Sequence, residues 1–234
     1  PGPRPARGRP HRGERNPLHQ GDAVGMITLI DYGAGNLASL EGALDRLGLE
    51  HVRAERPERG AKAGPFILPG VGHFESAQVA LRERGWWREL PHLVADGRPL
   101  LGICLGLQLL AEGSEEAPRA SGLGLLPGIV RRLGPGVKVP HMGWCRVQQH
   151  IPHPALPDPA EAWLYFVHSY ALDPGPETVY TARHGRVFSA VEARGRVMGF
   201  QPHPEKSGAM GLKLLQAALA WMGASAAVPE APCN

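Results

Sequence analysis

Short apolar runs alternate with amphipathic stretches through the first half of the chain. Apolar runs of a few residues predict buried strands, and apolar residues recurring three or four positions apart predict helices. Asn36 suits the start of the first helix and Gly48 suits its end. The expected strands are 27–30, 51–54, 65–68 and 99–103, and the expected helices are 37–47, 75–84 and 86–95. This alternation predicts parallel strands with helices on both faces of a sheet.

The second half has a different pattern, in which strand candidates follow one another closely and turns join them. These strands are expected at 129–133, 163–167, 178–183, 187–191 and 197–200, before a final amphipathic helix near 210–222. Such close spacing is typical of antiparallel strands. We therefore expect an α/β fold: a three-layer sandwich whose mostly parallel central sheet is extended by antiparallel strands in the second half.

The 234-residue chain is 43% hydrophobic, which is enough for one substantial core. We expect that core in residues 26–223. Residues 1–25 include five prolines and five glycines with almost no aliphatic side chains, which predicts a disordered leader, and residues 224–234 predict a frayed tail. The leader is either a simple extension before Met26 or an arm for RNA binding or targeting.

Charge and cysteine content exclude several classes of protein. The chain has 25 basic and 22 acidic residues, and residues 1–25 hold five and two of them, so the rest is balanced at 20 each. A balanced domain lacks the basic field that attracts nucleic acid.

No apolar run reaches the roughly 18 residues of a membrane span, so we expect a cytoplasmic protein. Three widely spaced cysteines support neither a disulfide framework nor a metal site, and no cofactor is expected.

The most informative segment is an apolar strand that runs through Gly-Ile-Cys-Leu-Gly at 102–106 into a predicted helix. This pattern matches a nucleophile elbow with cysteine in place of serine, because its glycines allow a sharp turn and close packing. The Cys104 thiol then lies at a helix N-terminus, which favours thiolate, and the Leu105 N–H can donate to an oxyanion. The alternative is a buried structural cysteine between two packing glycines.

A thiol nucleophile needs a base, and sequence context separates the eleven histidines. Most lie in the leader, in polar connections or at a turn, whereas His168 and His203 each follow an apolar strand. Only His203 is followed two positions later by a carboxylate, Glu205, in a proline-flanked segment that can return the carboxylate to the imidazole. Cys104, His203 and Glu205 therefore form a candidate triad. The alternative for His203 is a capping or hydrogen-bonding role within its loop.

A Gly-rich loop, Pro-Gly-Val-Gly at 69–72, follows the strand that ends at Leu68. It lacks the Lys and Ser or Thr of a phosphate-binding loop, so a nucleotide site is not supported. Its backbone can instead supply the second N–H of an oxyanion hole. Considered alone, the segment is equally well explained as a turn.

Six segments in this order resemble the class I (triad) glutamine amidotransferases, and within them the glutaminase subunits of imidazole glycerol phosphate synthase. They are DYGAGN at 31–36, LPGVG at 68–72, GICLGLQ at 102–108, PHMGW at 140–144, YFVHSY at 165–170 and QPHPEKS at 201–207. The resemblance implies the fold of that class and glutamine as substrate. It also implies that Cys104, His203 and Glu205 are the triad, that Val71 and Leu105 frame the oxyanion hole, and that the glutamine site is lined by Gly72, Gln108, Glu116 and Ser169.

The same resemblance implies a heterodimer in which ammonia passes to a separate cyclase subunit, a (β/α)8 barrel. It implies that four residues face that subunit: Asn36, Trp144, Tyr165 and Lys206. The chain departs from the family pattern at Cys145, where the family usually has Asn, and this puts one hydrogen bond near the interface in doubt. The leader is also absent from the family pattern.

We therefore expect hydrolysis of glutamine to glutamate and ammonia for a cyclase that makes imidazole glycerol phosphate and aminoimidazole carboxamide ribotide in histidine biosynthesis. Other functions stay open at this point: a cysteine hydrolase or peptidase with the same elbow, a glutaminase serving another synthase, and a binding module with a vestigial site. Activity on glutamine separates the enzymes from the module. Recovery of a barrel cyclase with the chain separates this synthase from other glutaminases.

Overall fold

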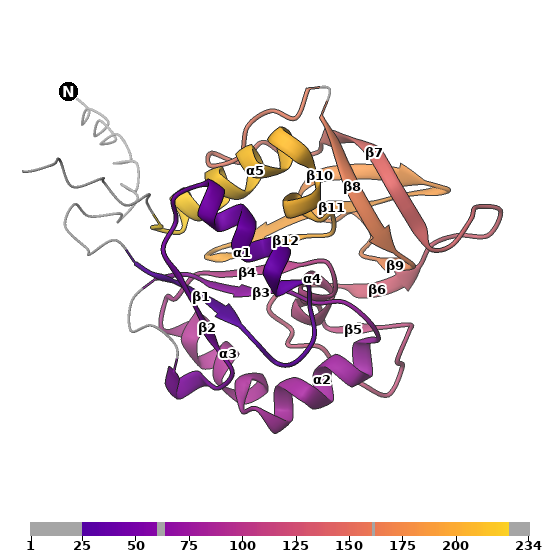
Figure 1. Ribbon diagram of the computed structural model, residues 1–234. Coiled ribbons are helices and arrows are strands. Elements are labelled where there is room, and N and C mark those ends of the chain that lie inside the picture. The colour runs from indigo at the N-terminus through magenta and orange to yellow at the C-terminus, as the bar shows by residue number, and fades with distance from the viewer. Residues whose placement is uncertain (1–24, 60–63, 161, 225–234) are drawn as a thin grey trace, which may run out of the picture.

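A nine-stranded sheet forms the centre of the computed structural model, which describes residues 25–59, 64–160 and 162–224 (Figure 1). Five neighbouring strands are parallel, in the order β2 (His51–Ala54), β1 (Ile27–Ile30), β3 (Phe66–Leu68), β4 (Leu100–Ile103) and β12 (Val197–Phe200). Antiparallel strands extend the sheet in the order β11 (Arg186–Arg194), β10 (Thr178–His184), β7 (His141–Gln149) and β8 (Trp163–His168). The predicted mixed sheet is confirmed.

Helices cover both faces of the parallel strands (Figure 1). Side chains alternate between the faces of a strand, so Leu29 of β1 enters one core cluster and Ile30 enters the other. The first cluster contains the apolar residues of α1 (Leu37–Arg46) and α5 (Gly208–Trp221). The second contains those of α2 (Phe74–Glu83), α3 (Trp86–Ala95) and α4 (Leu105–Leu110). This arrangement is the predicted three-layer sandwich.

The second half differs from the prediction at β6 (Ile129–Arg132), which does not join the nine-stranded sheet. It forms a three-stranded sheet with β5 (Gly113–Ser114) and β9 (Tyr170–Ala171). Only Val130 of β6 is buried, so the strand lacks the two apolar faces that the interior of the large sheet requires. Placing this strand on the large sheet was therefore wrong.

The strand β7 was not predicted, although it spans nine residues. Only His141 and Val147 in it are buried, and its sequence HMGWCRVQQ has no clear alternation of apolar and polar residues. Pairing with β8 places Trp144 opposite Tyr165. Two segments of the family resemblance that lie apart in the sequence are thereby brought together. Two short 3-10 helices, Pro57–Arg59 and Pro204–Lys206, complete the described elements.

The predicted leader 1–25 and tail 224–234 lie outside the described residues, except for Gly25 and Ala224. Their disorder and the extent of the single domain therefore stay predictions. Within the described ranges, no helix is long and apolar enough to cross a membrane.

Two glycines bring the backbone of α4 tightly against the strands. A Cβ atom on Gly106 would lie 1.9 Å from the carbonyl oxygen of Leu68, at the end of β3. A Cβ atom on Gly102 would lie 2.7 Å from the carbonyl carbon of Gly106. Because these are contacts with backbone atoms, no change of rotamer can relieve them. The Gly-x-Cys-x-Gly pattern is thus a packing requirement of the elbow.

The variant Gly106→Ala should lower the free energy of unfolding by about 3 kcal/mol or more, because α4 must move away from β3. Gly134→Ala is the matched control, since a Cβ atom there meets nothing within 4 Å. We expect it to change the free energy of unfolding by less than about 0.5 kcal/mol. Urea denaturation measures both, and equal stability of the two variants would contradict the close contact at Gly106.

Candidate active site

Cys104 lies on the sharp turn between β4 and α4, with φ 55° and ψ −110°. A positive φ is unfavourable for a residue with a side chain, and it persists where neighbouring structure enforces it. Here the Cys104 N–H donates to the Phe200 carbonyl at 2.7 Å, and its carbonyl accepts from the Gln108 N–H at 3.2 Å. The predicted elbow is present, with its cysteine fixed between strand β12 and helix α4.

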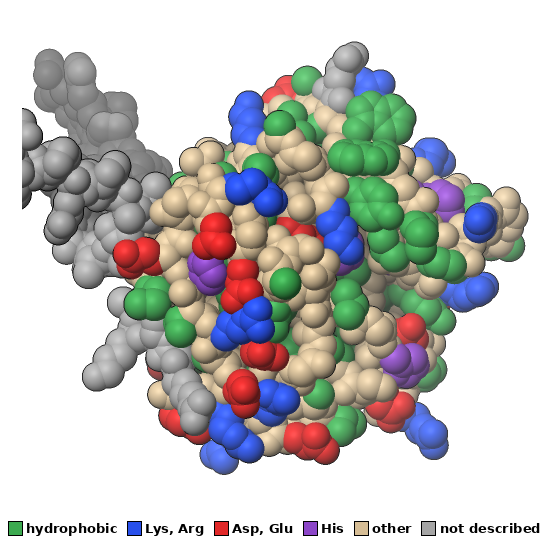
Figure 2. Space-filling model, viewed as in Figure 1, with side chains coloured by type: hydrophobic (Ala, Val, Ile, Leu, Met, Phe, Trp, Pro, Cys, Tyr) green, Lys and Arg blue, Asp and Glu red, His purple; other side chains and the backbone are tan. Residues whose placement is uncertain are grey.

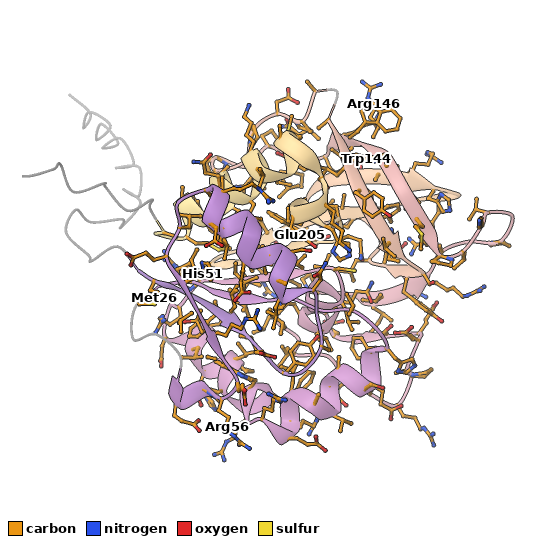
Figure 3. The ribbon with its side chains drawn as sticks, viewed as in Figure 1. Met26, His51, Arg56, Trp144, Arg146 and Glu205 are labelled. Carbon is orange, nitrogen blue, oxygen red and sulfur yellow. The ribbon has the colours of Figure 1, made fainter. Side chains whose placement is uncertain are left out.

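His203 and Glu205 follow β12 and form a buried pair. The His203 Nδ1 lies 2.8 Å from the Glu205 Oε1, and their side chains are 5% and 4% exposed. The His203 N–H donates to the Tyr165 carbonyl at 2.9 Å, and the Ser207 hydroxyl donates to the His203 carbonyl at 2.7 Å. Figure 3 shows Glu205 inside the molecule, near α1. Strand β8 and the segment after β12 thus fix the imidazole jointly.

The electrostatics of this pair favour a charged imidazole. Burial lowers the pKa of His203, but hydrogen bonds to Cys104 and Glu205, together with their charges, raise it above its usual value. An imidazolium stabilises an adjacent thiolate. The structure therefore brings the predicted triad residues together in a form suited to a thiolate–imidazolium pair supported by a carboxylate.

His168, the other histidine after an apolar strand, belongs to a different network. Its Nδ1 lies 3.0 Å from the Tyr170 carbonyl, and its Nε2 lies 3.2 Å from the Nδ1 of His141. Because a carbonyl only accepts, the His168 Nδ1 carries the proton. Burial lowers the pKa of His168 to about 3. This imidazole stays neutral at physiological pH and is poorly suited to take up a proton.

A pocket of about 260 Å³ opens beside the Cys104 thiol and the His203 imidazole. It contains every residue that the family resemblance assigns to the oxyanion hole or to glutamine. These lining residues are Val71, Gly72, Leu105, Gln108, Glu116 and Ser169. The pocket is also lined by four residues that were not predicted to belong to it: Pro140, Val167, His168 and Tyr170.

The N–H groups of Val71 and Leu105, which were predicted to form an oxyanion hole, are not both free to bind a ligand in this structure. The Leu105 N–H, which follows the nucleophile, donates to the Gly70 carbonyl at 3.4 Å. The N–H and C=O of a trans peptide point in opposite directions, so the Val71 N–H of the same peptide points away from Leu105. Rotation of this one peptide would free the Leu105 N–H and turn the Val71 N–H toward the pocket.

Hydrogen bonds decide which atoms of Gln108 and Glu116 are available to a ligand. The Gln108 Nε2 donates to the Tyr170 carbonyl at 2.8 Å and to the Gln201 Oε1 at 3.1 Å, which uses both amide hydrogens. Its Oε1 is left as an acceptor. The Glu116 Oε2 accepts the Phe74 N–H at 2.8 Å, at the start of α2. Gln108 therefore presents an acceptor, and Glu116 a negative charge, to the pocket.

Trp144 and Tyr165 belong to an apolar surface on β7 and β8. Their ring centroids are 5.9 Å apart, and Trp144 is 52% exposed. Met142 and Trp163 are also exposed, although they were not among the residues predicted to face the partner. Figure 2 shows hydrophobic side chains gathered over these strands, and Figure 3 shows Trp144 and Arg146 on β7. Exposed apolar surface of this kind is typical of protein–protein contacts.

Asn36 and Lys206, the other two residues assigned to the partner, each line a cavity together with His203. The Asn36 Oδ1 accepts the Ser39 N–H at 3.4 Å and so caps α1, as predicted. Asn36 also lines a small cavity with His203 and Glu205. Lys206 is exposed at the pocket that contains Cys104. The four residues thus connect the apolar surface to the site.

Cys145, where the chain departs from the family pattern, has no part in the pocket beside Cys104. Its thiol donates to the Arg183 carbonyl on β10 at 3.3 Å, and burial raises its pKa. Cys104 and Cys145 are the free cysteines of the described ranges. Among those residues, no group of three or more His, Cys, Asp or Glu side chains could hold a metal ion.

Two buried side chains of the site had no separate signal in the sequence. Tyr32 is 2% exposed, and its hydroxyl has no hydrogen-bond partner among the described residues. It lies 2.8 Å from the position that a Cβ atom on Gly70 would take. Gln201 is fully buried, and its Nε2 lies 3.8 Å from the Cys104 Sγ. Both lie within segments of the family resemblance, but only the fold brings them to Gly70 and Cys104.

Comparison with known proteins agrees with this geometry. The family model described as glutamine amidotransferase class-I matches residues 28–220. A solved structure titled "Crystal structure of glutamine amidotransferase" has a TM-score of 0.68 at 22% identity, covering 85% of this chain and 100% of that chain. At this identity the likeness concerns the fold.

Relatives with much higher identity are named imidazole glycerol phosphate synthase subunit HisH. The protein from Halalkalibacterium halodurans is 46% identical over 201 residues, which cover 82% of this chain and 94% of the relative. That from Desulfitobacterium hafniense (strain DSM 10664 / DCB-2) is 45% identical over 206 residues, which cover 87% and 98%. The chain therefore belongs to the class-I glutamine amidotransferases, in the branch whose members are named imidazole glycerol phosphate synthase subunit HisH.

Proposed function

We propose that this chain is the glutaminase subunit of an imidazole glycerol phosphate synthase and hydrolyses glutamine through Cys104, His203 and Glu205. The observation that carries the proposal is an elbow cysteine beside a buried imidazole whose other nitrogen lies 2.8 Å from a carboxylate. Relatives of 45–46% identity, matched over nearly their whole length, have the corresponding name.

The first half-reaction forms a thioester. The Cys104 thiolate forms a bond to the carboxamide carbon of glutamine, and the carbonyl electron pair moves to oxygen. The His203 imidazolium then gives its proton to the amide nitrogen as the C–N bond breaks, which releases ammonia. Glu205 holds the imidazole in the required tautomer and stabilises its cation.

The second half-reaction hydrolyses the thioester. Neutral His203 takes a proton from water while the water oxygen forms a bond to the thioester carbon. The C–S bond then breaks, the electron pair returns to the Cys104 sulfur, and glutamate leaves. This restores the thiolate–imidazolium pair with which the cycle began.

Four residues of the pocket would hold the substrate. The Gln108 Oε1 is an acceptor for an N–H of glutamine, because both hydrogens of its own amide are used elsewhere. The Glu116 carboxylate suits the substrate ammonium group, and Gly72 and Ser169 line the same pocket. The Val71 and Leu105 N–H groups would stabilise the oxyanion after the Gly70–Val71 peptide rotates.

The partner in this proposal is a cyclase subunit with a (β/α)8 barrel, which consumes the ammonia. The exposed Trp144 and its apolar neighbours offer a docking surface, and Tyr165, Asn36 and Lys206 extend from it toward the triad. In the resulting cytoplasmic heterodimer, the barrel would form imidazole glycerol phosphate and aminoimidazole carboxamide ribotide. Co-purification of a barrel cyclase with this chain tests the assignment to this synthase.

The choice of base can be tested by replacing the two histidines separately. His203→Ala should reduce glutamate release by about 10³-fold or more, as for loss of a triad member. His168→Ala should cost less, because burial keeps that imidazole neutral and, among the described residues, its hydrogen-bond partners are His141 and the Tyr170 carbonyl instead of a carboxylate. Thermal unfolding of both variants controls for loss of the fold. The reverse ranking among folded variants would overturn the assignment of the base.

The division of chemistry between the subunits predicts the behaviour of Cys104→Ala. The complex with this variant should make no imidazole glycerol phosphate from glutamine but should still make it from ammonium salts at alkaline pH, where free ammonia is abundant. The matched control is Cys145→Ala, which replaces the other described thiol and should leave both activities intact. Retained use of glutamine by Cys104→Ala would exclude this residue as nucleophile. Loss of both activities would show that Cys104 supports the fold or the interface.

A further inference from the structure

Gln201 is a fully buried residue whose side chain lies beside Cys104. It is the first residue after β12, is 0% exposed, and its backbone N–H donates to the Ala190 carbonyl on β11 at 2.9 Å. Its side-chain Nε2 lies 3.8 Å from the Cys104 Sγ. Its Oε1 accepts from the Gln108 Nε2 at 3.1 Å. The side chain therefore connects the thiol to a residue of the ligand pocket.

A single backbone carbonyl fixes the orientation of both amides. The Tyr170 carbonyl can only accept, so Gln108 must present its NH₂ group there, at 2.8 Å. The same NH₂ group faces Gln201, which must therefore present its oxygen to Gln108 and its own NH₂ to Cys104. The reverse orientation of Gln201 would bring two NH₂ groups together and place a carbonyl oxygen against the sulfur. Gln108 thus donates to both Tyr170 and Gln201, and Gln201 donates to Cys104.

The sulfur has neighbours that favour opposite protonation states. The Val167 carbonyl lies 3.6 Å from the Cys104 Sγ and can accept only from a thiol. The Gln201 amide and the His203 imidazolium donate, and so favour thiolate. Because Gln201 is fully buried, water cannot replace its N–H when the amide is removed.

We infer that Gln201 is a positioning residue, which orients the Cys104 sulfur and stabilises its thiolate through an amide held in place by Gln108 and Tyr170. This inference rests on the proposed function, because it concerns the same nucleophile. It also links occupancy of the pocket to the reactivity of the thiol, since Gln108 lines the pocket and bonds to Gln201.

The test measures alkylation of individual cysteines by iodoacetamide as a function of pH, in the full chain, by mass spectrometry of peptides. Gln201→Met keeps a similar side-chain volume without the donor, and Gln201→Glu keeps an acceptor for Gln108 but places a carboxylate at the sulfur. Gln78→Met is the matched control, because Gln78 is also buried but its Nε2 donates to the Ser121 carbonyl. Cys145 serves as the internal reference in every variant.

We expect Gln201→Met to slow alkylation of Cys104 at pH 7 by about tenfold, with the midpoint of its pH profile moved to higher pH. Gln201→Glu should slow it further, because a negative charge disfavours the thiolate. Alkylation of Cys145 should not change, and Gln78→Met should match the unmodified chain at both cysteines.

An unchanged Cys104 profile in either Gln201 variant would overturn the inference. A change that appears equally at Cys145 would do so as well, since it would reflect a general loosening of the structure. Glutamate release is measured in parallel, and its absence from the unmodified chain with its cyclase would reject the proposed function. Alkylation needs no glutamine, so it decides the role of Gln201 in either case.

Discussion

The site depends on the backbone turn at Cys104, where strand β4 passes into helix α4 with φ 55°. The turn exists because Gly106 lets α4 lie directly on the end of β3, and because the Cys104 N–H is bound to the Phe200 carbonyl of β12. The same strand β12 leads into His203 and Glu205. One turn therefore positions the proposed nucleophile, the N–H that follows it, and the strand that leads to the proposed base. Ordinary helix or strand geometry at Cys104 would separate these groups.

The sequence predicted much of this arrangement because the relevant signals are local. The glycines at 102 and 106, the apolar strand before them, and the carboxylate two positions after His203 are visible without the fold. The pattern failed for β6 and β7, whose few buried residues leave little periodicity to detect. It also gave no indication that the Leu105 N–H would be bonded to the Gly70 carbonyl, because the orientation of one peptide has no sequence signature. The role inferred for Gln201 depends on contacts with Gln108 and Cys104, which lie nearly one hundred positions away.

The site contains one rigid part and one part that can adjust. The three side chains of the proposed triad are buried, and backbone hydrogen bonds anchor two of these residues to β8 and β12. The Gly70–Val71 peptide, by contrast, lies in a loop where Val71 is 43% exposed. The Gly70 carbonyl accepts the hydrogen bond of the Leu105 N–H. An oxyanion donor stabilises the transition state by about 3–4 kcal/mol. The orientation of this one peptide can therefore decide whether glutamine hydrolysis is slow or fast. Trp144 and its apolar neighbours are exposed, and we propose that a partner bound there favours the peptide orientation in which hydrolysis is fast.

We propose that this chain contains the residues that hydrolyse glutamine but lacks an open oxyanion hole, and that binding of the cyclase subunit opens it. The most direct measurement compares glutamate release by the isolated chain with release in the presence of saturating cyclase. We expect a rise of about 10²–10³-fold or more, since one oxyanion donor contributes that much and rotation of the Gly70–Val71 peptide supplies two. Equal rates with and without the cyclase would contradict it.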